Sequence, residues 1–107
     1  MKLLVFLAKG FETIEFSAFI DVMGWAKTDF DCKIDVVTCG LNRKVISSFN
    51  VPVLVDKVID EVSADDYDAL AIPGGFEEFG FYEEAYNEQL LELIRLFDSQ
   101  KKWIATV

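Results

Sequence analysis

The sequence has no histidine, and it has only two cysteines and two prolines among 107 residues. Without imidazole, a transition-metal site is improbable and neither thiol has the usual base to activate it. Cys32 and Cys39 lie near the two ends of an expected strand, about 20 Å apart and beyond disulfide reach. We therefore expect reduced, structural thiols, a cytoplasmic location, and no nucleophilic catalysis by either cysteine.

Long hydrophobic runs and excess basic charge are also missing. The apolar run from Leu3 to Ala8 is too short for a signal peptide, and no stretch reaches the roughly 18 apolar residues of a membrane span. Ten basic residues oppose 19 acidic ones, which gives a formal net charge of −9. Such a charge repels phosphate backbones and anionic lipids. We expect neither nucleic acid nor a membrane as a partner.

Two kinds of apolar segment alternate along the chain, and hydrophobic residues make up 52% of it, enough for one core. Runs that are continuously apolar or rich in β-branched residues predict strands, and helical spacing predicts helices between them. The expected strands are 3–8, 33–39, 44–46, 51–55, 68–72 and 103–107. The expected helices are 11–27 and 82–100, with a helical turn at 57–62 and Tyr86, Leu90, Leu93, Ile94 and Phe97 on one side of the second helix.

This alternation predicts one α/β domain over residues 1–107, with a doubly wound, mostly parallel sheet and helices on both faces. The segments 44–46 and 51–55 predict a small hairpin. Ligands of such sheets bind beyond the carboxyl ends of the strands. That rule selects residues 9–15, residues 73–78 and whatever follows Val107.

The first predicted helix is apolar almost all round. Ile14, Ala18 and Val22 form a stripe with a spacing of four, and other apolar residues lie off it. One face can cover the sheet, and the other needs a second cover, for which another copy of the protein is the natural candidate. The residues off the stripe are Phe16, Ile20 and Trp25.

Glu15 is the first candidate for chemistry. It lies in the first turns of this helix, with Phe11 and Phe19 four residues away on either side. Such surroundings reduce the solvation of a carboxylate and favour its protonated form, which can donate a hydrogen bond to a thiolate or a reacting oxygen. The alternative is that an acid near a helix N-terminus complements the helix dipole, a role that Glu12 fits better.

The motif IPGG, residues 72–75, is the second candidate. Pro73 ends the strand because it lacks an N–H group, and Gly74 and Gly75 allow the backbone to approach a ligand and to turn N–H groups towards it. Free N–H groups of this kind can hold an oxyanion. An ordinary strand-to-helix turn remains the alternative.

Several familiar sites are excluded by their missing motifs. The first strand is not followed by GxGxxG, no P-loop is present, and the acids of residues 60–68 lack the spacing of a calcium loop. A phosphorylated receiver domain would need an acidic pair after the first strand and an aspartate where Pro73 stands.

Three segments together resemble the ThiJ/PfpI family. LAKGFETIEF (7–16) is similar to the segment after the first strand of that family, DALAIPGGF (68–76) to its strand ending in PGG, and KKWIATV (101–107) to the strand that leads into its nucleophilic cysteine. The resemblance covers essentially the whole chain. It implies a flavodoxin-like sandwich, usually a homodimer packed partly through the first helix.

The resemblance also implies a site. Glu15 would hydrogen-bond the family's cysteine and act as general acid/base, and Gly74 and Gly75 would bind the oxyanion of the substrate. The cysteine is expected at position 108, after Val107, so the first expected partner is the missing C-terminal part of the same protein, either separated by cleavage or present as a separate chain. Phe76 replaces a residue that is often small or polar in relatives, which bears on substrate preference.

Two functions follow from the resemblance. One is a cofactor-independent enzyme with glyoxalase-like or deglycase-like activity on small 2-oxoaldehydes, or a related peptidase-like hydrolase. The other is a non-enzymatic sensor of oxidative stress, or a chaperone-like dimer, whose cysteine oxidises to a sulfinic acid stabilised by protonated Glu15.

Overall fold

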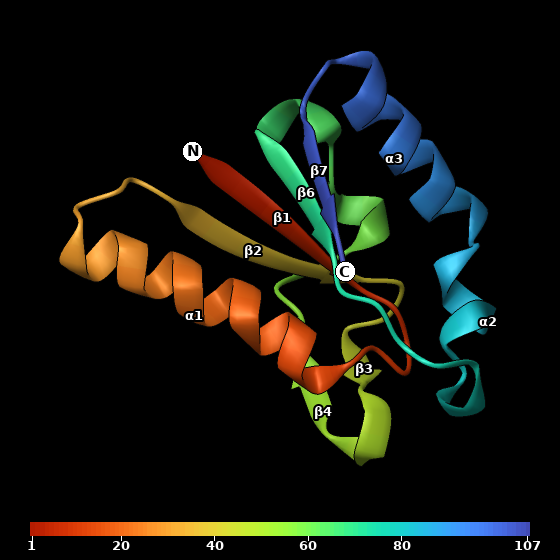
Figure 1. Ribbon diagram of the computed structural model, residues 1–107. Coiled ribbons are helices and arrows are strands. Elements are labelled where there is room, and N and C mark those ends of the chain that lie inside the picture. The colour runs from red at the N-terminus through yellow and green to blue at the C-terminus, as the bar shows by residue number, and fades with distance from the viewer.

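A computed structural model describes residues 1–107, and its centre is a parallel five-stranded sheet in the order β5-β2-β1-β6-β7 (Figure 1). Every neighbouring pair in this sheet is parallel. The α/β, doubly wound arrangement expected from the sequence is therefore confirmed. The strands are β1 (Lys2–Leu7), β2 (Asp35–Gly40), β5 (Lys57–Val58), β6 (Ala69–Ile72) and β7 (Trp103–Thr106).

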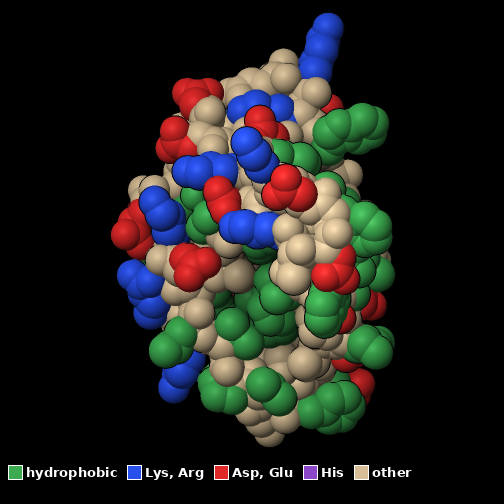
Figure 2. Space-filling model, turned by 90° about the vertical axis from the view of Figure 1, so that its left-hand side faces the viewer, with side chains coloured by type: hydrophobic (Ala, Val, Ile, Leu, Met, Phe, Trp, Pro, Cys, Tyr) green, Lys and Arg blue, Asp and Glu red, His purple; other side chains and the backbone are tan.

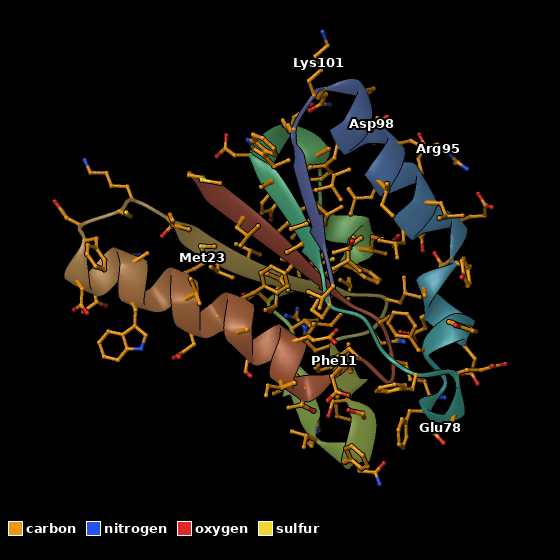
Figure 3. The ribbon with its side chains drawn as sticks, viewed as in Figure 1. Phe11, Met23, Glu78, Arg95, Asp98 and Lys101 are labelled. Atoms are coloured by element: carbon orange, nitrogen blue, oxygen red, sulfur yellow. The ribbon has the colours of Figure 1, made fainter.

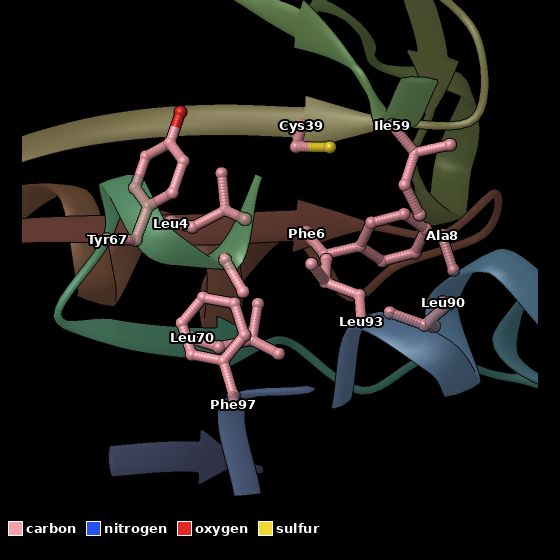
Figure 4. Packing of buried hydrophobic residues seen from close by; sticks show 11 residues of the cluster. Leu4, Phe6, Ala8, Cys39, Ile59, Tyr67, Leu70, Leu90, Leu93 and Phe97 are labelled. Atoms are coloured by element: carbon pink, nitrogen blue, oxygen red, sulfur yellow. The ribbon is translucent and has the colours of Figure 1, made fainter. Parts of the chain in front are cut away.

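The two long helices cover opposite faces of the sheet: α1 (Thr13–Asp29) lies on one and α3 (Glu88–Ser99) on the other (Figure 1). Alternation along β1 supplies both cores, because successive side chains point to opposite faces. Leu4 and Phe6 enter the cluster under α3, and Leu3 and Val5 enter the cluster under α1. Figure 4 shows the α3-side cluster, in which Phe6 lies close to Leu93.

Full burial makes β1 the anchor of the fold. Leu4, Val5, Phe6 and Leu7 are completely inaccessible to solvent. Each such side chain contributes about 1.5–3 kcal/mol relative to an exposed one. The central strand therefore holds the loop that follows it, which carries part of the candidate site.

The expected hairpin is confirmed, and the segment after it is partly different. β3 (Lys44–Ile46) and β4 (Pro52–Leu54) pair antiparallel, apart from the main sheet. Of the expected helical turn at 57–62, the first two residues instead form β5 beside β2, and only Ile59–Glu61 makes a 3₁₀ turn. Extended pairing with β2 is available there, and it satisfies backbone groups that a single turn would leave free.

The prediction of one helix over residues 82–100 is wrong in one respect, because the structure has two helices there. α2 (Phe81–Ala85) ends before Tyr86, and α3 begins after Asn87, whose side-chain oxygen accepts the N–H of Gln89 at 2.8 Å. Asparagine is a preferred N-cap, so it starts a new helix at this point. Tyr86, expected on the buried side, is 66% exposed.

Helix α1 turns its stripe of Ile14, Ala18 and Val22 away from the sheet. Phe16, Phe19 and Met23 pack against the sheet, whereas Ile14 and Val22 are 73% and 61% exposed. In Figure 3, Met23 lies on the side of the helix that faces the sheet. A helix that is apolar all round has no polar face to set its rotation, so spacing alone could not identify the buried side.

One sheet face near β7 is left without a helix. Ile104 packs towards the α3 cluster, while Trp103 is 80% exposed and Ala105, which points the same way, is exposed too. Figure 2 views the molecule from the left-hand side of Figure 1, and there hydrophobic side chains gather in the middle of the lower half, while charged side chains cover the upper half and the edges. None of the helices combines the length and the hydrophobicity that a membrane span requires.

Candidate functional site

The loops after β1 and β6 meet at the carboxyl end of the sheet. The N–H of Glu12 donates to the carbonyl of Gly74 at 2.7 Å, and Phe11 and Gly75 form an isolated antiparallel bridge. The two sequence motifs, separated by about 60 positions, therefore form one corner.

Glu15 lies in the first turn of α1 and reaches into this corner. Its Oε1 accepts the backbone N–H of Gly74 at 2.8 Å, and Oε2 has no hydrogen-bond partner in the protein. The side chain is half-buried, with one side on an apolar groove of about 470 Å³. The second oxygen is therefore available to a reacting group. The groove is lined by Ile14, Glu15, Ala18, Phe19, Val22, Met23 and Val107.

The phenylalanines expected around Glu15 are only partly there. Phe19 lines the same groove, but Phe11 is fully buried and packs edge-on against Phe16, with ring centroids 5.4 Å apart. Figure 3 shows Phe11 beside the start of α1. Phe11 thus supports the helix start that carries Glu15.

Both glycines of the corner are required by close contacts. A Cβ at position 74 would lie 2.7 Å from the Val107 carbonyl oxygen and 3.0 Å from Glu15 Oε1. A Cβ at position 75 would collide with the ring of Phe81 and lie 2.5 Å from the Gly10 carbonyl oxygen. Only glycine permits these approaches, because any other residue would push the loops apart.

The two glycine amides have different surroundings. The N–H of Gly74 is engaged by Glu15, whereas the N–H of Gly75 has no acceptor in the protein. The sequence predicts oxyanion binding by both. The geometry leaves Gly75 as the free donor and makes Gly74 the group that holds Glu15.

The carboxyl end of β7 reaches the same corner. The carbonyl of Val107 lies against Gly74, and the Val107 side chain lines the groove beside Glu15. Consecutive Cα atoms are about 3.8 Å apart, so a residue bonded to Val107 would enter the corner directly.

The two cysteines lie outside this corner and are not bonded to each other, as expected. Cys39 is fully buried near the end of β2, and burial, with a smaller effect of Glu61, raises the pKa of its thiol to about 12. Cys32 is exposed in the loop before β2. No group of three or more His, Cys, Asp or Glu side chains is arranged to hold a metal ion.

A clamp beside the corner has no signal in the sequence. The backbone N–H of Lys9 donates to Glu84 Oε1 at 2.8 Å, and Lys9 Nζ forms an ion pair with Glu83 at 2.9 Å. The hydrogen bond and charge of Glu83 raise the pKa of Lys9. The clamp ties α2 to the loop after β1, and α2 in turn places Phe81 against Gly75.

Comparisons with known proteins agree with this architecture. The chain is 31% identical over 94 residues to Protein DJ-1 homolog B of Arabidopsis thaliana, covering 88% of this chain and 20% of that protein. It is 24% identical over 106 residues to an uncharacterized protein of Mycoplasma pneumoniae, covering 99% of this chain and 92% of that protein. The crystal structure of Drosophila melanogaster DJ-1beta superposes with a TM-score of 0.82 at 31% identity, covering 98% of this chain and 53% of that one.

The chain thus spans a fifth of the plant protein and about half of the fly structure. Its sheet and helices are those of the flavodoxin-like domain found in these structural neighbours. The profile of the DJ-1/PfpI family matches residues 1–107, and the chain belongs to this family.

Proposed function

We propose that this chain forms the acid/base half of a cysteine-dependent enzyme that acts on small 2-oxoaldehydes, in a glyoxalase-like or deglycase-like reaction. One observation carries the proposal: Glu15, held by Gly74, presents an unbonded oxygen where β7 ends. Family membership supports a thiol nucleophile entering there, at position 108.

Each group of the corner then has a role. The thiolate adds to the aldehyde carbon while the C=O electron pair moves to the oxygen, and Glu15 Oε2 then moves the proton of that carbon to the neighbouring carbonyl carbon. Water hydrolyses the resulting thioester, which frees the thiol and releases a 2-hydroxy acid. The N–H of Gly75, which has no acceptor in the protein, donates to the oxygen that becomes negative. Gly74 fixes the carboxyl group, so that little reorganisation is needed during the reaction.

Replacing Glu15 tests the role of its carboxyl group. In the complete native protein, Glu15→Gln keeps an acceptor for the Gly74 N–H but cannot transfer a proton. We expect kcat/KM for methylglyoxal to fall about 10²–10⁴-fold. Glu77→Gln is the matched control: Glu77 is an exposed acid in the loop after β6, and this variant should retain full activity. Equal rates for Glu15→Gln and the native protein would refute the proposed role.

The groove beside Glu15 also supports a partner for this chain. Its walls are apolar apart from Glu15, and one of them is the exposed side chain of Val107. We propose that the C-terminal part of the same protein, which supplies the thiol, covers this area. Intact-mass measurement of the native protein should then show either a longer chain or a second polypeptide that copurifies; a lone 12.1 kDa species would contradict this proposal.

A redox sensor is the second candidate, because a protonated Glu15 could equally donate a hydrogen bond from its second oxygen to an oxygen of an oxidised cysteine. Titration with peroxide followed by intact-mass measurement separates the two functions. Ready formation of a sulfinic acid together with no turnover of aldehydes favours the sensor, and turnover favours the enzyme.

A further inference from the structure

Three phenylalanine rings form a continuous aromatic patch next to the candidate site. The ring centroids of Phe49 and Phe79 are 5.1 Å apart, and those of Phe76 and Phe79 are 6.4 Å apart. Phe49 is 74% exposed and Phe76 is 50% exposed. Phenylalanine rings that contact one another yet remain in water are available to a ligand.

The backbone at Phe49 is unusual for such a residue. Phe49 has φ 61° and ψ 26°, in the left-handed region, and Asn50 follows with φ 66°. A bulky residue in this region is a true outlier, and strain of this kind collects at functional positions. The backbone bonds of Ser48 to Phe11 and of Asn50 to Ser47 hold the turn. Burial does not explain the choice of phenylalanine, because the side chain is largely in solvent.

The patch begins at the residue that follows Gly75, whose N–H group is the free donor of the site. Phe76 follows Gly75 directly in the chain, and Phe79 comes three residues later in the turn before α2. A hollow of about 320 Å³ adjoins the patch, lined among others by Asn50, Phe79 and Gly80. A substrate whose oxygen accepts the Gly75 N–H can therefore extend a substituent towards the rings.

Charge narrows the class of substituent. The same hollow is lined by the carboxylates of Glu78 and Glu83, and only Lys9, already paired with Glu83, contributes a positive charge. The protein as a whole carries a net charge of −9. An anionic group would be repelled, while a flat uncharged ring would stack on the phenylalanines.

We propose that Phe49, Phe76 and Phe79 form a specificity subsite that selects carbonyl substrates bearing an uncharged aromatic group. This inference rests on the proposed function for the position of the carbonyl and goes beyond it in naming the class of substrate.

Binding of unreactive ketones to the complete protein, followed by NMR titration, tests the subsite without any turnover. Acetophenone should bind about tenfold more tightly than butanone, because only the former has a ring to pack on the patch. Benzoate should bind more weakly than acetophenone. Phe76→Ala and Phe49→Gly should each remove most of the preference for acetophenone. Glycine suits the left-handed backbone, so the Phe49→Gly variant keeps its fold even if Phe76→Ala does not.

Phe30→Ala is the matched control, because Phe30 is 77% exposed at the far end of α1. It should leave the preference unchanged. Equal binding of the two ketones to the native protein, or full preference in the Phe49→Gly variant, would overturn the subsite. Turnover of methylglyoxal, which has no ring, is measured in parallel. If the protein does not turn over methylglyoxal but still prefers acetophenone to butanone, the proposed reaction is refuted and the patch is supported as a binding site.

Discussion

The thiol of Cys39 shows how burial governs a single residue in this protein. It is fully enclosed in the α3-side cluster, where loss of solvation raises its pKa from 9.0 to about 12, with a smaller contribution from the charge of Glu61. A thiol in this state is a small core residue rather than a nucleophile.

The raised pKa of Cys39 predicts a loss of stability in alkali. Between about pH 9 and about pH 12 the unfolded chain gives up the thiol proton and the folded chain keeps it, so the free energy of unfolding falls as pH rises, by at most about 1.4 kcal/mol per pH unit. This contribution is fully present below the unfolded pKa. Urea unfolding at about pH 8 and about pH 10.5 measures the loss.

Cys39→Ala removes this contribution, and its free energy of unfolding should depend less on pH than that of the native protein. Burial also raises the pKa of Tyr67, which acts in the same direction, so part of the slope remains. Cys32→Ala, at an exposed thiol, is the control and should keep the native slope. Identical slopes in all three proteins would show that Cys39 does not carry the effect.

At the scale of elements, the break between α2 and α3 depends on one side chain. Asn87 caps α3 through its bond to the Gln89 N–H, and Glu88 adds an acid to the first turn of that helix. The cap matters because α3 supplies Leu90, Leu93 and Phe97 to the core.

Asn87→Ala should lower the free energy of unfolding by about 1 kcal/mol, since the N–H group loses its partner. Asn87→Asp keeps an acceptor and should stay near the native value. Thermal melts of both variants provide the measurement. A melt for Asn87→Ala that matches the native protein would mean that packing of α3 alone fixes the helix start.

Predictions from the sequence succeed where a local pattern has one outcome. The apolar run of residues 3–8 could hardly be anything but a buried strand, and the joint presence of Glu15 and PGG pointed to one corner. The hydrogen bond from Gly74 to Glu15 could not be predicted, because it joins loops far apart in the chain. The same is true of the Lys9 clamp, and of the rotation of α1, for which an all-apolar helix contains no signal.

At the scale of the whole molecule, the outward face of α1 remains the strongest candidate for contact with a second copy. Ile20 and Trp25 are exposed along it, outside the groove beside Glu15, and none of the 17 residues of the helix is fully buried. A surface of this kind on an isolated protein favours association. We therefore keep the homodimer through α1 as a prediction.

Trp25→Lys should lower the apparent mass in light scattering of the complete protein without loss of helical circular dichroism, because the side chain is already 57% exposed. Leu96→Lys, an exposed position of α3 on the opposite face, is the control and should leave the mass unchanged. A native protein that remains monomeric at micromolar concentration would contradict the prediction.

The central place of β1 also has a consequence for biosynthesis. Leu3 pairs with Val36 on one side and with Ala69 on the other, so both neighbours of the first strand are translated after it. While the nascent chain leaves the ribosome, β1 has a free edge until β6 has been synthesised and can pair with it. Long-range parallel pairing of this kind folds slowly. A chaperone that binds short apolar peptides should therefore engage this N-terminus during synthesis and release it once β6 has emerged.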